Sequence, residues 1–405
     1  MRPRSPAISR PIHIKAVLLL ASTMTVLAGA IIAPSLPGMN RHFGGDAEVA
    51  VQLVLTIPAL MITLFSPAMG YLADRFGRRN LLLVALLVYG VAGLSGFLID
   101  RVDVLILSRA ILGIAVAGII SISTTLIGDY FNATERARFL GLQGSFMALG
   151  GVVFLNLGGA LADWSWRGPF LVYIAGLLLL PYARAVLYEP SAPTDTGNES
   201  GAPLSPEPFP WGRVILAYSL GLISMAMFYM VPAQLPFLLT ERHEVSGTAI
   251  GLALSTTPMA AAVVSFTYGR LKPWLSVSTL YVIGFVLVAI GFSIVGYAHS
   301  YALTLVGVSL AGLGFGIFLP NTNVWLMRIT PTAYRGRVFG GSSSAIFLGQ
   351  FLSPLVVAPV AVLLGSLRDV YLAAAVLCLS LAVVMAMLGV TWLRHDDPLT
   401  PARGQ

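Results

Sequence analysis

Long apolar runs separated by short polar segments dominate the sequence. Each run is about 20 residues long, the length at which an α-helix crosses the hydrocarbon layer of a bilayer, about 30 Å thick. Membrane-spanning strands would instead alternate apolar and polar residues in segments of about ten, and this pattern is absent from the sequence. The twelve runs cover residues 14–36, 48–70, 80–99, 103–126, 138–161, 169–188, 213–238, 248–268, 275–297, 300–327, 338–363 and 369–393. We therefore expect an all-α membrane protein with twelve transmembrane helices.

The composition agrees with solvation by lipid. Of the 405 residues, 57% are hydrophobic and only 10% are charged, which leaves too few polar groups to cover a soluble protein of this size. The formal net charge is +7, but the basic residues form no cluster interleaved with aromatic residues, so we exclude nucleic acid as a partner. The expected partners are the lipid bilayer and a small-molecule substrate.

The basic residues are divided unequally between the two sides of the membrane. Loops that remain in the cytoplasm carry the excess of Lys and Arg. With the N-terminus in the cytoplasm, that side receives 18 of the 24 basic residues, the opposite side receives five, and Arg109 falls inside the fourth span. We therefore predict a multi-pass protein of the inner (plasma) membrane with both termini in the cytoplasm.

One polar segment interrupts the series of spans. Residues 190–210 are rich in Pro, Ser, Gly and acidic residues, a composition that does not support a folded core. We predict an N-terminal six-helix bundle at 1–189, a cytoplasmic linker at 190–211 and a C-terminal six-helix bundle at 212–405.

An internal repeat supports this division. A shift of 199 residues places Arg136–Gly141 on Arg335–Gly340, and the same shift places Gly70 on Gly269. Both copies lie on the predicted cytoplasmic side, so the halves have the same topology. Parallel halves related by an axis along the membrane normal form a substrate site between them near the bilayer midplane. The expected fold is thus two pseudo-symmetric six-helix bundles.

The loop between the second and third spans carries a specific motif. It reads Gly-Tyr-Leu-Ala-Asp-Arg-Phe-Gly-Arg-Arg over residues 70–79. In these ten residues the chain resembles the major facilitator superfamily, whose signature loop G-x-L-A-D-R-x-G-R-R it matches at every defined position. The resemblance implies membrane transport by alternating access, and a switching role for Gly70, Asp74, Arg75, Gly77, Arg78 and Arg79.

The resemblance also implies partners for two of these side chains. Asp74 would face the start of the eleventh helix, near residues 336–339, in only one of two conformations. Arg78 would pair with Asp129 at the end of the fourth span. A simpler alternative is that the charges only hold the loop in the cytoplasm.

The fourth span carries Arg109-x-x-x-Gly113-x-x-x-x-Gly118, which resembles a pattern of proton-linked members of the superfamily. An arginine inside a span usually faces the bundle interior. Because Arg109 lies about six residues from the non-cytoplasmic end of the span, snorkelling of its side chain to the interface is the alternative. We expect the two glycines to be close-packing positions.

The fifth span departs from the antiporter signature G-x-x-x-G-P-x-x-G-G. Residues 150–159 keep the first and last glycines, but Phe154 and Leu155 replace the central Gly-Pro. The change weakens the inference to antiport, while the remaining glycines and the sequence after Gly159 still resemble the drug and metabolite efflux branch.

No span carries an acidic residue at mid-depth; all 17 acidic residues fall in loops or near span ends. Candidates for proton coupling are therefore Asp74 and Asp129, with Arg109 as a charge partner. A cavity without an acid also favours a neutral, weakly amphipathic or anionic substrate. Candidate cavity residues, of which we expect about half to face the cavity, are Met24, Gln143, Met147, Met225, Phe228, Tyr229, Thr256, Thr257, Asn321, Asn323 and Gln350.

Three classes of function follow. The first is proton-coupled efflux of a small amphipathic drug or metabolite, by a monomer that uses an ion gradient and no cofactor. The alternative is an uptake symporter or facilitator for a small nutrient. An enzyme is not expected, because the five histidines are scattered in tails and loops and the single cysteine, Cys378, has no partner for a metal site.

Overall fold

The computed structural model describes residues 11–45, 47–190, 209–331 and 334–391, and within these ranges it contains helices and no strand. The elements are α1 (Pro11–Ala30), η1 (Ala33–Ser35), α2 (Leu36–His42), α3 (Glu48–Phe76), α4 (Arg78–Ser95), α5 (Val102–Tyr130), α6 (Ala133–Trp164), η2 (Gly168–Tyr173), α7 (Ile174–Val186), α8 (Trp211–His243), α9 (Gly247–Leu271), α10 (Val277–Tyr297), α11 (Tyr301–Ile329), α12 (Arg335–Leu364) and α13 (Leu367–Thr391).

Twelve apolar helical segments in the described residues are long enough to cross a membrane. The first combines α1, η1 and α2, and the sixth combines η2 and α7. The predicted count is confirmed, although the first segment extends to His42, six residues beyond the expected boundary. The boundaries predicted for the two bundles and the linker stay a prediction, because residues 191–208 lie outside the described part.

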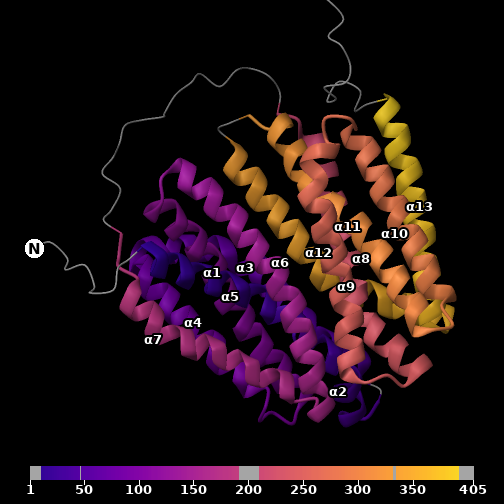
Figure 1. The fold of residues 1–405 in the computed structure, drawn as a ribbon, viewed down its shortest axis with the longest axis horizontal. Helices are drawn as coiled ribbons and strands as arrows, with labels where there is room; N and C mark the ends of the chain where they lie inside the picture. Colours follow the sequence, from indigo (N-terminus) through magenta and orange to yellow (C-terminus); the bar gives the residue numbers. More distant parts are fainter. Residues whose placement is uncertain (1–10, 46, 191–208, 332–333, 392–405) are drawn as a thin grey trace, which may run out of the picture.

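The helices form two bundles, one from α1–α7 and one from α8–α13 (Figure 1). We call the side on which α1 begins and α13 ends the terminus side, and the opposite side, which holds α2 and the connection from α8 to α9, the far side. Figure 1 shows the bundles meeting near α2, α6 and α9 and diverging toward the terminus side. Between the bundles, α6 packs against α9 and α3 packs against α12.

Local sequence explains where several helices begin. Ser246, Ser276 and Ser300 precede α9, α10 and α11, and each side chain accepts a hydrogen bond from the backbone N–H three residues later. Asn132 caps α6 in the same way. These caps satisfy donors that have no partner within the helix.

Glycines allow α6 and α9 to approach closely on the far side. A Cβ atom added at Gly251 would lie 2.5 Å from the carbonyl oxygen of Leu155, and one added at Gly247 would lie 2.7 Å from that of Gly159. Side chains at these positions would force the helices apart. The far side is therefore held closed by backbone-to-backbone contact between the two halves.

Candidate functional site

A cavity of about 620 Å³, the central cavity, lies between the two halves. Its volume is in the range of drug-sized ligand sites. The cavity is lined by Ser22, Thr25, Val26, Ala28, Gly29, Leu55, Pro58, Ala59, Ile62, Ile119, Ile120, Thr124, Leu140, Gln143, Gly144, Met147, Gly151, Leu155, Met225, Phe228, Tyr229, Val231, Pro232, Leu254, Thr257, Pro258, Leu319, Ile346, Phe347 and Gln350. None of these lining residues is acidic, basic or a histidine.

The central cavity faces the terminus side. Its far-side end is closed by the glycine contacts between α6 and α9. On the terminus side, a Cβ atom added at Gly141 or Gly144 of α6, or at Gly340 of α12, would have no heavy-atom neighbour within 4 Å. At these three positions α6 and α12 are therefore not packed against a neighbouring helix.

Uncharged polar groups are spaced around the apolar wall of the cavity. The amide of Gln143 donates to the hydroxyl of Ser22 at 2.6 Å, which joins α6 to α1. From the other half, the Tyr229 hydroxyl lies against α1, 2.9 Å from where a Cβ atom of Gly29 would stand. A solute without charge would find hydrogen-bond partners here, whereas an ion would find no counter-charge.

The structure places seven of the eleven predicted cavity residues on the wall: Gln143, Met147, Met225, Phe228, Tyr229, Thr257 and Gln350. Their role in binding stays a prediction. The other four predictions are wrong as to position: Met24, Thr256, Asn321 and Asn323 do not line the cavity.

Two of these four side chains are buried instead of lining the cavity. Met24 is 5% exposed in the hydrophobic core, and its backbone carbonyl accepts a hydrogen bond from Tyr89 of α4. The Asn321 amide is buried within the C-terminal half, donating to the Val277 carbonyl and accepting from the Tyr268 hydroxyl. Thr256 bonds its own helix at Ala253.

Asn323 lies one turn beyond Leu319, on the same face of α11, but only Leu319 is on the cavity wall. Position within an apolar span therefore did not identify the residues that line the cavity. Sequence reasoning also missed small hydroxyl residues on the wall such as Thr25 and Thr124. Threonines and serines are equally common at helix-packing positions, so the sequence carried no signal that separates the two roles.

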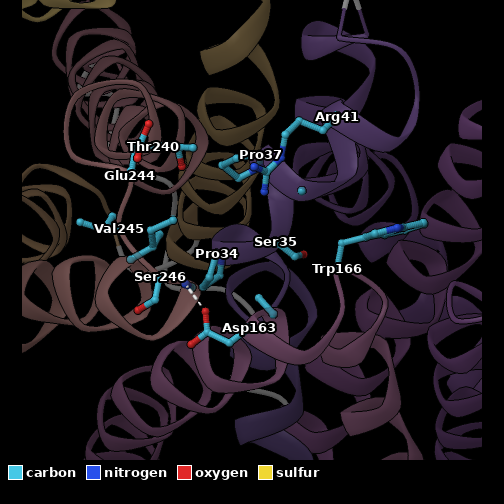
Figure 2. A pocket seen from close by; sticks show the side chains of 14 residues that line it. Pro34, Ser35, Pro37, Arg41, Asp163, Trp166, Thr240, Glu244, Val245 and Ser246 are labelled. Carbon is cyan, nitrogen blue, oxygen red and sulfur yellow. Dashed lines mark hydrogen bonds between the residues drawn. The ribbon is translucent and has the colours of Figure 1, made fainter.

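A carboxylate links the two halves on the far side. Asp163, at the end of α6, accepts hydrogen bonds from the backbone N–H groups of Gly247 at 2.5 Å and Thr248 at 3.0 Å and from the Thr248 hydroxyl at 2.5 Å. Figure 2 shows this carboxylate directed at the start of α9, beside Ser246. An anion at a helix N-terminus satisfies unpaired N–H groups and the helix dipole. We call these three residues the far-side latch.

A second polar link between the halves is buried. Gln52 of α3 and Gln234 of α8 donate to each other, at 3.0 and 3.2 Å, and both side chains are almost fully buried. Glu48 accepts a further hydrogen bond from Gln52 at 2.9 Å. The paired amides satisfy one another only while the far side is closed.

The signature loop is ordered by contacts within the N-terminal half. Gly77 has φ +87°, a conformation that favours glycine, and it separates α3 from α4. Arg78 and Asp129 form the ion pair that the resemblance implies. The side chain of Asp74 lies outside the described part, so its contact with α12 stays a prediction; Gly70 and Gly336 themselves have open space around them.

Glu189 is a residue of this region that the sequence did not reveal. Its carboxylate accepts hydrogen bonds from the backbone N–H groups of Arg78 at 2.6 Å and Arg79 at 2.9 Å, so it caps α4. The Arg79 guanidinium donates to the carbonyls of Leu187 and Arg184. These contacts tie the loop to the end of α7, immediately before the segment predicted as a linker.

Arg109 is fully buried within the N-terminal half, so the snorkelling alternative is wrong. Its Nη2 donates to the carbonyls of Ala92 and Gly93 at 2.5 and 2.9 Å. The guanidinium carbon lies 5.0 Å from the ring centroids of both Phe170 and Tyr173. Carbonyl dipoles and aromatic faces thus stabilise its charge in place of a carboxylate.

Arg109 and Asp129 lie far apart on α5. They are 20 residues apart along one helix, roughly 30 Å at 1.5 Å per residue. The structure therefore does not bring Arg109 to the signature-loop carboxylates. Gly113, by contrast, is a close-packing position as expected, since a Cβ atom there would lie 2.6 Å from the Cα atom of Pro58.

An exposed charge cluster joins three segments of the N-terminal half on the far side. The Nε2 atom of His42 lies 2.7 Å from a carboxylate oxygen of Asp100, and Arg167 donates to the same oxygen. The hydrogen bond with His42, followed by that with Arg167, lowers the pKa of Asp100 below its ordinary value of 3.8.

Two relatives with named activities align with most of the chain. The bacillibactin exporter of Bacillus subtilis (strain 168) is 25% identical over 361 residues, which cover 85% of this chain and 89% of the relative. The class C tetracycline resistance protein of Escherichia coli is 28% identical over 358 residues, covering 84% and 88%.

Solved transporters share the fold. A bacterial homologue of the human lysosomal transporter Spinster, in an inward-facing and occupied conformation, superposes with a TM-score of 0.78 at 18% identity, covering 97% of this chain and all of the other. A D-xylose-proton symporter gives 0.75 at 18% identity, covering 92% and 97%. The family model described as Major Facilitator Superfamily matches residues 18–235 and again residues 217–404. The chain is therefore a membrane transporter that belongs to the Major Facilitator Superfamily.

Proposed function

We propose that the protein exports small, uncharged amphipathic molecules by alternating access, in exchange for protons. The observation that carries the substrate class is the central cavity, which is large enough for a drug-sized molecule and has no charged side chain on its wall. Moving an ion into such an apolar site without a counter-charge is unfavourable. The similarity to a bacillibactin exporter and to a tetracycline resistance protein supports export.

The orientation of the protein in the membrane decides the side to which the central cavity opens. The positive-inside distribution of Lys and Arg assigns the terminus side to the cytoplasm and the far side to the exterior of the inner membrane. In this assignment the structure is an inward-open state whose outer side is closed by α6, α9 and the far-side latch. Because both halves that line the cavity belong to one chain, we propose that a monomer is the transporting unit.

Asp74 is the first candidate for coupling to protons. Arg109 and Asp129 are too far apart to form one charge-coupled pair, and Asp129 is already paired with Arg78. We therefore expect Asp74→Asn to abolish gradient-driven transport, with Asp103→Asn as an exposed-carboxylate control on the far side. Full gradient-driven transport by Asp74→Asn would refute this role.

Uptake is the second candidate function, favoured by the loss of Gly-Pro in the fifth span. Here α6 is a single helix from Ala133 to Trp164, with Phe154 and Leu155 at the positions where the antiporter signature has its Gly-Pro. An uptake symporter would move substrate and protons in the same direction.

Inside-out vesicles distinguish the two functions. We would measure accumulation of the uncharged dye N-phenyl-1-naphthylamine in energised vesicles that contain the protein, with and without a protonophore, against vesicles that lack the protein. Export predicts accumulation inside the vesicles that collapses with the protonophore. Protein-dependent loss of dye from loaded, energised vesicles would instead support proton-coupled uptake.

A further inference from the structure

A side pocket of about 200 Å³ adjoins the central cavity inside the C-terminal half. It lies among α8, α9, α11 and α12. Met225, Phe228, Leu319 and Ile346 line both the pocket and the cavity, so these four side chains are all that the two spaces share. The other pocket residues include Gly221, Ser224, Ser265, Phe315, Phe318 and Thr322.

Three phenylalanines give the pocket an aromatic lining. The rings of Phe228 and Phe315 are nearly perpendicular, at 86°, with centroids 5.3 Å apart. Phe315 and Phe318 make a second edge-to-face pair, at 71° and 6.1 Å. A planar ring can extend such an arrangement by edge-to-face or offset contact. An apolar protein cavity of about 150 Å³ holds benzene, so this pocket has room for one substituted ring.

One polar group in the pocket has no partner. The Ser224 side chain is only 6% exposed, and its hydroxyl makes no hydrogen bond. The other two hydroxyls on the wall are satisfied: Ser265 donates to the Gly316 carbonyl at 2.9 Å and Thr322 to the Phe318 carbonyl at 2.8 Å. Buried hydroxyls are normally paired, because leaving one unpaired forfeits its hydration without replacement. Ser224 is thus a pocket-wall residue whose buried hydroxyl has no hydrogen-bond partner in the protein.

We propose that Ser224, Phe228, Phe315 and Phe318 form an aryl subsite of the transporter. It binds one aromatic ring whose hydroxyl or carbonyl substituent hydrogen-bonds Ser224, while the rest of the substrate occupies the central cavity. The proposal rests on the proposed function, since it defines the substrates as uncharged compounds that end in an oxygen-substituted ring.

Two isosteric probes test the subsite. p-Cresol and p-xylene differ only in a hydroxyl that replaces a methyl group. We would measure their binding to the full chain in nanodiscs by equilibrium dialysis in sealed cells, with empty nanodiscs as the blank for partition into lipid. The ratio of p-cresol affinity to p-xylene affinity should be about tenfold lower in Ser224→Ala than in wild-type protein, the effect of one buried hydrogen bond. Ser224→Ala should change p-xylene binding less than about twofold.

Two further variants distinguish binding at the subsite from unspecific effects of a substitution on the protein. Ser123 in α5 is also buried and without a hydrogen-bond partner, but it lines neither cavity, so Ser123→Ala should leave both affinities unchanged. Gly221 lines only the side pocket, and a Cβ atom there would lie 3.8 Å from Ile346 Cγ1, an ordinary contact. Gly221→Leu should therefore fill the pocket and weaken both probes about tenfold or more.

Three results would each overturn the subsite. These are no measurable binding of p-cresol to wild-type protein, an affinity ratio that Ser224→Ala leaves unchanged, and binding that survives Gly221→Leu in protein that remains monodisperse. Binding in nanodiscs requires neither a gradient nor transport. The outcome is therefore separate from whether the protein exports its substrate.

Discussion

The far-side latch should set the balance between the inward-open and outward-open states. Asp163 contacts Gly247 and Thr248 of the other half, so these contacts exist only while the far side is closed. Asp163→Asn keeps the size of the side chain but removes its charge. The variant therefore weakens the closed far side without adding bulk at the interface.

The free-energy change caused by Asp163→Asn follows from the contacts that the substitution removes. Hydrogen bonds to a charged group contribute about 1.5–3 kcal/mol, and a carboxylate at a helix N-terminus contributes about 0.3–2 kcal/mol. Because Asp163 is exposed to solvent and Asn keeps one acceptor oxygen, we take the low end, about 1.4 kcal/mol. This corresponds to an outward-open population about tenfold larger.

Thiol labelling from outside the cell measures this population. Leu155 is 5% exposed, and its backbone packs against Gly251 at the closed interface. In a Cys378→Ala background, Leu155→Cys should react with a membrane-impermeant maleimide only when the far side opens. We expect Asp163→Asn to raise the labelling rate about tenfold when closing is fast relative to labelling.

Asp103→Asn is the matched control. Asp103 is an exposed carboxylate on the far side, and its hydrogen bonds are to Arg101, in its own half. Its removal should leave the labelling rate unchanged. The far-side latch does not set this balance if Asp163→Asn labels within about twofold of its parent, or if Asp103→Asn accelerates labelling equally.

Two further substitutions test the N-terminal half. Arg109→Lys should destabilise the protein by about 2 kcal/mol, because lysine lacks the planar fork that contacts two rings and two carbonyls; thermal unfolding should show this loss, and Arg101→Lys, an exposed control, should not. The lowered pKa of Asp100 means that its contribution to stability is present above pH 3.8 and is lost as the pH falls through the lowered value. The difference in melting temperature between wild type and Asp100→Asn should therefore shrink between about pH 6 and about pH 3, and a constant difference would contradict this assignment.

The number of spans could be predicted from sequence because a membrane fixes the length of a helix. Which residues face the cavity could not, since the rotation of each helix depends on its neighbours. Met24 and Gln143 both lie within apolar spans, yet Met24 is buried in the hydrophobic core, whereas Gln143 lines the cavity.

The signature loop was recognisable by resemblance, including the pair of Arg78 and Asp129. The capping role of Glu189 could not be recognised from the sequence, because an acidic residue beside a Pro-rich segment is typical of a loop. The same holds for Asp163, whose partners Gly247 and Thr248 are more than 80 residues away. Contacts between the halves are long-range, and no local pattern encodes them.

Substrate charge is the most direct test of the central cavity. We would compare proton-driven accumulation of uncharged N-phenyl-1-naphthylamine with that of ethidium, a permanent cation, in inside-out vesicles. Gln143→Glu would serve as an isosteric variant that adds a carboxylate to the cavity wall. Wild-type protein should transport the uncharged dye alone, and Gln143→Glu should gain transport of ethidium. Equal transport of both dyes by wild-type protein would contradict this prediction.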